Sequence, residues 1–275
     1  MANNPLQKFF RQPKIYIGFP SQGAYTKPGV IQGDPTNVPV FGMTGMDEII
    51  IKTPDALLNG ESTVKVIESC VPNIKDGWEL NNLDVDIILT AIRIATYGNS
   101  ITVSHKCSHC GVEHEYELEL TQLIDHFSSI QYDNRVVLKD VIVKLQPLTY
   151  RQITDYGLRN FQLQQMLKQI EKVEDEAERK VQLSKLYSDF AELQNEVYLA
   201  GIESIEAGNT VVTERSFIEE WARNTEKGAF DLIRKQVDAN REKWKNPPTP
   251  VVCDECKGTD EISVELDNAT FFALA

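Results

Sequence analysis

Two stretches of the chain share one pattern, HKCSHCGVEHEYELEL (105–120) and VVCDECKGTDEISVEL (251–266). In each stretch, a Cys-x-x-Cys pair is followed by turn-forming residues and then by a strand-like alternation of acidic and apolar residues. A change to period-two alternation on either side of a tight turn predicts two short strands with the cysteine pair between them. The two stretches therefore predict two matching hairpins, although 142 residues separate Cys110 from Cys253.

The two pairs together offer four thiolates, which is the ligand set of a tetrahedral Zn²⁺ site. We expect one structural zinc ion per chain, held by Cys107, Cys110, Cys253 and Cys256. Four thiolates leave no coordination position for water, so catalysis at the metal is not expected. A redox role for the pairs is one alternative, although neither pair opens a helix after a buried strand. Chance pairs that hold no metal are the other alternative.

Histidines surround the first cysteine pair at positions 105, 109 and 114. Either His105 or His109 could replace a cysteine as ligand, but with four thiols available we expect exposed or second-layer roles for them. The fifth cysteine, Cys70, precedes Val71 and Pro72 and is expected to be a small buried apolar residue.

The remaining sequence predicts mainly helices. We expect helices at 61–70 and 83–97, a helix beginning at 53–55, and a strand hairpin at 136–147. Residues 150–245 are expected to be helical throughout, with a capping box of Ser216 and Glu219. A short helix is expected within 269–274. The expected fold class is α+β, mostly helical, with a small zinc-ribbon-like β element made by the two distant cysteine pairs.

The pattern predicts three parts of the chain. Residues 1–40 are rich in proline and glycine and are expected to form an extended N-terminal arm. Residues 41–149 and 246–275 are expected to form a helical core with the split zinc ribbon. Residues 150–245 are expected to be a helical insertion, which is tolerable because loop-closure entropy grows slowly with length.

Composition excludes several classes of protein. The 275 residues carry 28 basic and 41 acidic side chains, a formal charge of −13. Nucleic acids and anionic membranes need a cationic surface, so we expect neither as a partner. No apolar run reaches the length of a membrane span, and the start has no signal-peptide core.

Motifs of known enzyme classes are missing. The sequence has no glycine-rich phosphate loop after a strand, no His-Glu-x-x-His and no Gly-x-Ser-x-Gly. Asp84 and Asp86 are expected on different faces of one helix, so they do not form an acid–base pair. We therefore predict no catalytic residues, no enzymatic activity and no small-molecule ligand.

A series of short motifs carries a resemblance to a known family. They are Met43-Thr44-Gly45-Met46-Asp47-Glu48, Pro54 to Leu58, Ser69-Cys70-Val71-Pro72, LTAIRIATYG (89–98), Cys107-Ser108-His109-Cys110-Gly111, Phe217-Ile218-x-x-Trp221 and the closing Cys253-x-x-Cys256. In this order they resemble the T4-type baseplate hub and hub-assembly proteins of contractile-tailed bacteriophages. The resemblance covers residues 41–275, and the long helical stretch 158–200 departs from it.

The resemblance implies a structural or assembly protein of the tail baseplate. Such a protein is assembled in the host cytoplasm, resides in the virion and has other phage tail and baseplate proteins as partners. The resemblance gives the four cysteines a role as zinc ligands and the Asp47-Glu48 turn a role in ordering the N-terminal region. Three alternatives remain open: a transient assembly chaperone absent from the virion, a zinc-ribbon nucleic-acid adaptor, and an enzyme of unrecognised type. The acidic strands beside both cysteine pairs disfavour the adaptor, because they repel phosphate.

Overall fold

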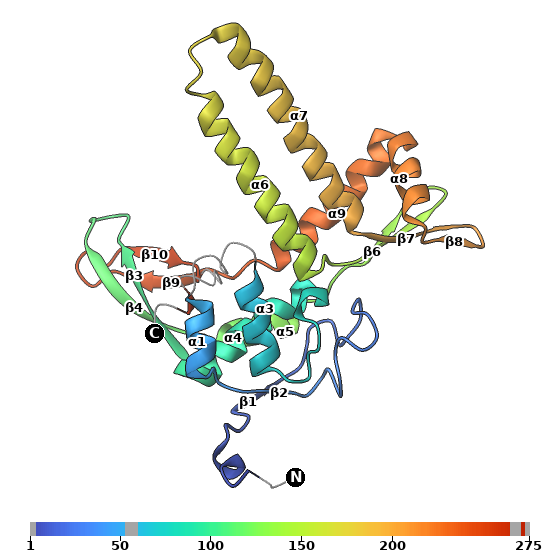
Figure 1. Ribbon diagram of the computed structural model, residues 1–275. Coiled ribbons are helices and arrows are strands. Elements are labelled where there is room, and N and C mark those ends of the chain that lie inside the picture. The colour runs from blue at the N-terminus through green and yellow to red at the C-terminus, as the bar shows by residue number, and fades with distance from the viewer. Residues whose placement is uncertain (1–3, 53–59, 265–270, 273–275) are drawn as a thin grey trace. The chain divides into compact units, whose positions relative to one another are not determined.

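A computed structural model describes residues 4–52, 60–264 and 271–272 of the chain (Figure 1). The chain divides into two compact units. Met1–Ile130 with Trp244–Ala275 forms the host unit, and Gln131–Lys243 forms the inserted unit. Both segments that carry cysteine pairs belong to the host unit. The expected helix start at 53–55 and most of the expected helix at 269–274 lie outside the described residues.

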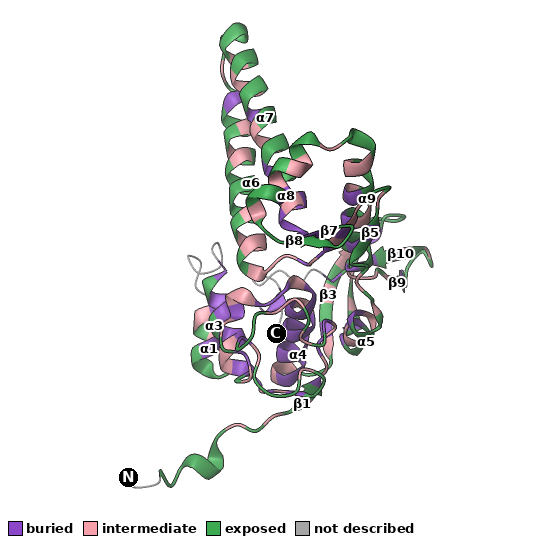
Figure 2. Cartoon of the chain, turned by 90° about the vertical axis from the view of Figure 1, so that its right-hand side faces the viewer, coloured by how far each residue is buried: buried purple, intermediate pink, exposed green. Residues whose placement is uncertain are grey.

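Helix α4 (Asn82–Tyr97) is the centre of the host unit. Nearly all of its residues from Leu83 to Ala95 are buried, as the purple ribbon in Figure 2 shows. A helix that is buried around nearly its whole circumference must be covered by other elements on all sides. The covering elements are α3 (Glu61–Cys70), α5 (Thr121–Ser129), β1 (Ile15–Ile17) and β2 (Val38–Val40). The helices expected at 61–70 and 83–97 are thus confirmed.

The expected extended arm at 1–40 is wrong beyond residue 10. Strands β1 and β2 pair antiparallel, with Ile15 opposite Val40, and Phe19 is also buried. The glycines that suggested an open arm instead form turns, three of them with positive φ. In the segment 4–10, which contains a short 3-10 helix (Gln7–Phe9), every side chain is exposed.

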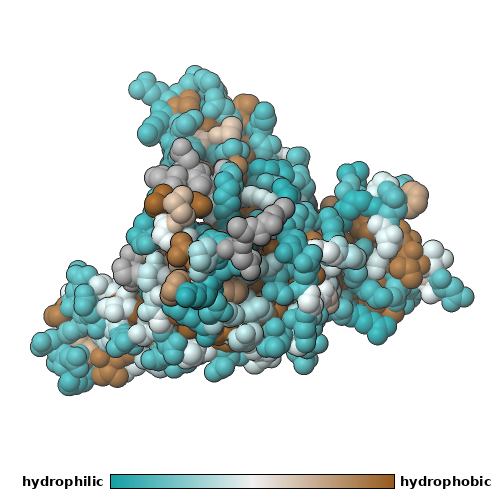
Figure 3. All heavy atoms as spheres, turned by 60° about the horizontal axis from the view of Figure 1, so that its bottom comes forward, coloured by the Kyte–Doolittle hydropathy of each residue, from teal (hydrophilic) through white to brown (hydrophobic). Residues whose placement is uncertain are grey.

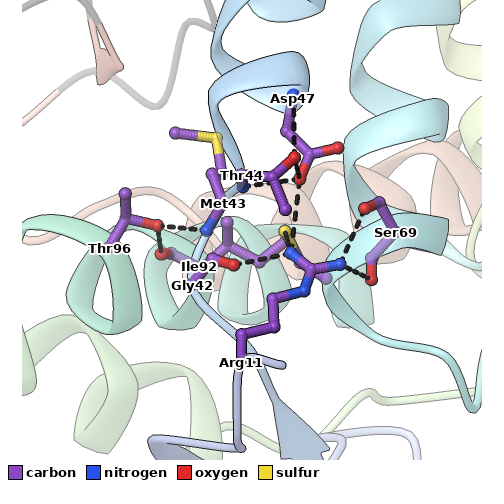
Figure 4. Close-up of polar contacts among 9 residues, drawn as sticks. Arg11, Gly42, Met43, Thr44, Asp47, Ser69, Ile92 and Thr96 are labelled. Atoms are coloured by element: carbon purple, nitrogen blue, oxygen red, sulfur yellow. Dashed lines mark hydrogen bonds and ion pairs between the residues drawn. The ribbon is translucent and has the colours of Figure 1, made fainter. Parts of the chain in front are cut away.

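Arg11 fixes the point where that exposed segment joins the host unit (Figure 4). Its guanidinium donates to the carbonyl oxygens of Gly42 and Ser69, both at 2.6 Å, and to Asp47 Oδ2 at 3.3 Å. Asp47 also caps helix α1 (Gly45–Ile51) in a capping box with Thr44. Burial opposes ionisation, but the hydrogen bonds from Thr44 and the charge of Arg11 lower the pKa of Asp47. The Asp47 turn therefore contacts the N-terminal region directly.

Two strand hairpins of the host unit carry the cysteine pairs. Strand β3 (Ser100–Lys106) pairs with β4 (Glu113–Glu119), and β9 (Thr249–Val252) pairs with β10 (Thr259–Ile262), both antiparallel. In both hairpins the cysteine pair occupies the connection between the strands, as the period-two pattern predicted. The remaining short element is a 3-10 helix (Gly77–Glu79) before α4.

The inserted unit is a four-stranded antiparallel sheet with helices. Its strands, in spatial order, are β5 (Arg135–Val137), β6 (Ile142–Leu145), β7 (Ile202–Ala207) and β8 (Thr210–Val212). The hairpin expected at 136–147 is confirmed, but it belongs to this unit and not to the expected segment 41–149, because β6 pairs with β7. The expectation of helix throughout 150–245 is wrong at β7 and β8, which form a hairpin around Gly208.

Four helices complete the inserted unit: α6 (Tyr150–Ile170), α7 (Glu176–Ala200), α8 (Arg215–Asn224) and α9 (Lys227–Lys243). One face of the sheet and the helices bury a common apolar cluster that includes Val143, Ile205, Ile218 and Ile233. The expected capping box of Ser216 and Glu219 is wrong. Glu214 is the N-cap of α8, without a side-chain cap, and the Ser216 hydroxyl lies 3.3 Å from the Glu214 carboxylate.

Hydrophilic side chains dominate the face shown in Figure 3, and the apolar side chains there form separate patches. Among the described residues, no helix combines the length and apolar character needed to cross a bilayer.

Candidate metal centre

The four expected ligands come together. The connections β3–β4 and β9–β10 place the sulfur atoms of Cys107, Cys110, Cys253 and Cys256 within 4.8 Å of one another. Cys107 Sγ lies 3.7 Å from Cys256 Sγ, and Cys110 Sγ lies 3.6 Å from Cys253 Sγ. Each close pair joins one hairpin to the other, so the cluster links the two distant parts of the host unit.

The backbone forms the same turn at both cysteine pairs. The amide of Cys107 donates to Val112 O at 2.9 Å, and the amide of Cys253 donates to Gly258 O at the same distance. In each turn a second amide, four residues after the first cysteine, donates back to that cysteine's carbonyl oxygen at 2.9 Å. That fourth residue has positive φ in both turns, 76° at Gly111 and 58° at Lys257. These repeated hydrogen bonds aim both thiols of each pair at the same side.

The sulfur spacing suits a tetrahedral zinc ion. Four thiolates at a Zn–S distance of about 2.3 Å lie about 3.8 Å apart along each edge of the tetrahedron. The separations of 3.6 and 3.7 Å are close to this edge and far longer than a disulfide bond. All four cysteines are free thiols. The donor set suits Zn²⁺, and the two separations across the hairpins match the tetrahedral edge.

The ionisation of the thiols also favours a cation. Backbone amides, that of Cys256 first, donate toward Cys253 and lower the pKa of this thiol to about 6. At Cys110 the Val112 backbone amide acts in the same direction, but desolvation and the three neighbouring cysteines raise the pKa to about 12. One thiol is thus easily ionised while another resists, because a thiol that donates a hydrogen bond to a neighbouring sulfur keeps its proton. A divalent ion would supply a positive charge that favours the thiolate form.

Polar side chains around the sulfurs link the two hairpins further. Asp260 of β10 accepts from the Ser108 amide at 2.8 Å and from the Ser108 hydroxyl. His105 Nε2 lies 3.2 Å from the same carboxylate. The hydrogen bonds from Ser108 are the largest of the causes that lower the pKa of Asp260. Sequence reasoning missed Asp260, and its only signal was its position four residues after Cys256.

The histidines lie next to the cluster, and each of the three has a hydrogen-bond partner. His114 Nε2 is 3.3 Å from Cys253 Sγ, and His109 Nε2 is 3.2 Å from Thr259 O. A Cβ atom on Gly258 would lie 2.5 Å from His109 Cδ2, so the glycine is needed for the ring to pack there. These contacts agree with a second layer around the cysteines.

The other residues singled out in the sequence have structural surroundings. Cys70 is fully buried, as expected, and burial raises the pKa of its thiol to about 12. Asp84 accepts from the amide and hydroxyl of Ser21 and from Asn81, so it holds the N-terminal segment 11–40 onto α4. His126 Nε2 lies 3.2 Å from Lys245 O.

Comparison with known proteins gives one match. No curated protein and no solved structure matches the chain. The model of one family, T4 bacteriophage base plate protein, matches residues 46–273, which includes both cysteine pairs and all of the inserted unit. The chain therefore belongs to the T4 bacteriophage base plate protein family and is a T4-type baseplate protein.

Proposed function

We propose that this protein is a non-enzymatic structural component of the hub region of a contractile-tail baseplate, and that one zinc ion cross-links its two cysteine hairpins. The observation that carries the proposal is the cluster of four free cysteine sulfurs in a member of a base plate family. Cys107, Cys110, Cys253 and Cys256 would hold the ion. A bound Zn²⁺ would neutralise the thiolates and cross-link the two ends of the host unit, and this adds directly to folding stability.

The exposed N-terminal segment is proposed to contact other tail proteins. Leu6, Phe9 and Phe10 are 60%, 73% and 55% exposed, and large apolar side chains gathered on a short segment favour a protein partner. Arg11 anchors the base of the segment, so its apolar side chains are presented from a fixed point. Binding would bury them.

Metal content tests the zinc proposal. Elemental mass spectrometry of the freshly purified full chain should give about one zinc per chain. The Cys253→Ser variant should lose the zinc and unfold at a lower temperature, whereas Cys70→Ser keeps the zinc because Cys70 is not in the cluster. A metal-free wild type with unchanged stability in Cys253→Ser would refute the proposal.

Baseplate assembly tests the role in the tail. A triple variant with serine at positions 6, 9 and 10 should fold normally and lower the yield of assembled baseplates, while Lys8→Gln should leave the yield unchanged. Mass spectrometry of purified virions then tests residence. Peptides of this chain in the finished tail support a structural component, and their absence favours a transient assembly chaperone.

A further inference from the structure

The α6–α7 hairpin of the inserted unit leaves much of its surface uncovered. Helix α6 has 21 residues, and Ile170 is its only buried residue. Helix α7 has 25 residues, of which Leu186, Leu193, Tyr198 and Ala200 are buried. Two helices that bury only a narrow seam between them retain broad free faces. In Figure 1 the two helices run side by side for most of their length.

One of these faces carries an open groove of about 530 Å³. We call it the groove face and define it by Gly157 and Asn160 of α6 and by Tyr187, Phe190 and Ala191 of α7. Tyr187 is 60% exposed. None of these five residues is charged, whereas the outward surface of an unpartnered helix is ordinarily charged. Arg241 of α9 also lines the groove and is the charged residue in its lining. The groove face thus has the composition of an interface core.

Gly157 gives an independent indication that something outside this chain occupies the groove. Glycine in the interior of a helix destabilises it relative to alanine. A Cβ atom at Gly157 would meet no described atom within 4 Å, so packing within this chain does not require glycine there. A side chain at this position would fill the groove, and its absence keeps the groove open.

The charges of the two helices favour a second copy of the chain as the occupant. Helix α6 has three basic residues and one acidic residue, whereas α7 has five acidic and three basic residues. A two-fold axis parallel to the helices would place α6 of each copy against α7 of the other. The net positive charge of each α6 would then face the net negative charge of the other copy's α7. This favourable contact occurs twice, because every contact of an isologous interface is repeated by the two-fold axis.

The size of the face is also sufficient. At a rise of about 1.5 Å per residue, α7 is about 37 Å long, and two packed helices are about 20 Å wide. One whole side of the hairpin, of which the groove face is a part, therefore measures at most about 700 Å² per copy, close to the roughly 800 Å² per partner of a stable complex. We propose that the groove faces of two copies pack together and form a two-fold symmetric four-helix bundle. This inference does not depend on the proposed zinc or hub role.

The ion pair between Arg159 of α6 and Glu196 of α7 shows that these two residues lie at the same height along the axis of the hairpin. Because the two helices are antiparallel, the positions five residues after Arg159 and five residues before Glu196 are again at one height. Gln164 therefore lies at the same height as Ala191. Gln164 lies four residues after Asn160 and so shares its face. A two-fold axis parallel to the helices keeps each residue at its level. Ala191 of one copy should therefore meet Gln164 of the other.

Sedimentation equilibrium of the full chain tests the association. We expect the 31.1 kDa chain to reach twice this mass with rising concentration between about 1 and 100 μM. Tyr187→Glu and Gly157→Glu should each weaken dimerisation at least tenfold, because each buries an unpaired charge. Ser188→Glu is the matched control, since the neighbouring helix position faces elsewhere. A wild type that stays monomeric, or an equal loss in the control, overturns the proposal.

A mixing experiment tests the orientation of the two copies. Ala191→Lys and Gln164→Glu each place two unpaired charges in their own homodimer. In an equimolar mixture, one lysine meets one glutamate and the other contact keeps wild-type residues. The mixture should therefore associate at least tenfold more tightly than either variant alone. Association no tighter than that of the separate variants overturns the parallel two-fold arrangement, and circular dichroism verifies that both variants fold.

Discussion

Asp260 accepts a hydrogen bond from the backbone amide of Ser108, a residue 152 positions earlier that lies between two of the clustered cysteines. The same carboxylate accepts from the Ser108 hydroxyl and lies 3.2 Å from His105 Nε2. The protein itself therefore joins the two cysteine hairpins, in addition to any bound ion. Hydrogen bonds of this kind pre-arrange ligands and commonly tune metal affinity.

Replacing Asp260 by asparagine should weaken metal binding. The amide keeps the size of the carboxylate but removes its charge and one of its acceptor oxygens, so Ser108 loses a partner. We expect zinc affinity to fall about tenfold, measured by competition with a chromophoric chelator. Glu261→Gln is the matched control, because Glu261 is the next residue and is exposed. Equal affinities in the two variants would contradict this role of Asp260.

Gly258→Ala should destabilise the host unit. The new Cβ would lie 2.5 Å from His109 Cδ2 and 3.2 Å from Cys256 Sγ. We expect a loss of about 1–3 kcal/mol in the free energy of unfolding, measured by urea denaturation with zinc present. Adding His109→Ala to this variant should restore part of the loss, because the ring is the nearer obstacle. A double variant no more stable than Gly258→Ala would show that the ring is not the cause.

Lys257→Gly should stabilise the second cysteine turn. Lys257 has φ 58°, a left-handed conformation that costs a non-glycine residue about 1–2 kcal/mol. Glycine occupies the equivalent place, Gly111, in the first turn. We expect a gain of about 1 kcal/mol by thermal unfolding, and a comparable loss for Gly111→Ala. Effects of the same sign in both variants would contradict the equivalence of the turns.

Asp86 should make stability depend on pH. Burial raises the pKa of Asp86 to about 7, and none of the described residues donates a hydrogen bond to its carboxylate. The folded chain therefore binds more protons than the unfolded chain between about pH 4 and 7, so the free energy of unfolding falls as the pH rises through this range. Asp86→Asn should be more stable than wild type at pH 7.5, by on the order of 2–4 kcal/mol. The two proteins should converge near pH 4, whereas the exposed Asp125→Asn should follow wild type throughout.

Arg11→Met should weaken the attachment of the N-terminal segment. The substitution leaves the Ser69 and Gly42 carbonyl oxygens without this donor and Asp47 without its ion-pair partner. Unsatisfied polar groups of this kind cost about 1–3 kcal/mol, measurable by chemical denaturation. Lys8→Met, in the exposed segment, should cost little. Faster proteolysis within residues 4–20 of Arg11→Met would identify the released region.

The cysteine cluster could be predicted because two signals agree: the Cys-x-x-Cys spacing and the alternating acidic strand that follows each pair. Each pair fixes two thiols on one turn, and the matching acidic strands indicated that the two hairpins belong together. The contact between Ser108 and Asp260 could not be predicted in this way. A single aspartate in an acidic strand carries no pattern, and its role depends on how two distant hairpins meet.

The N-terminal region shows why composition misled the prediction. Proline and glycine between residues 13 and 39 exclude a long helix, and that inference holds. They do not exclude a pair of three-residue strands, and Ile17 and Val38 are buried in such a pair. Strand β7 gives a second example, because it lies between two helical segments and its alternation of buried and exposed residues is short and imperfect. Its buried residues are Ile202, Ser204 and Ile205. Short strands follow from tertiary pairing more than from local sequence.

The distance between the cysteine pairs also orders events during synthesis on the ribosome. At about 5–20 residues per second, Cys253 emerges roughly 7–30 s after Cys110. All residues of the inserted unit emerge within that interval. In the folded chain its two ends are held together by the Asn240 side chain, which is hydrogen-bonded to the amide and carbonyl of Asp133. The inserted unit can thus fold while the nascent host unit still lacks two of the four clustered cysteines. The host unit is completed only after Cys256 has emerged, so a translation product that stops before Cys253 would present an unclosed cysteine pair to the cellular quality-control machinery.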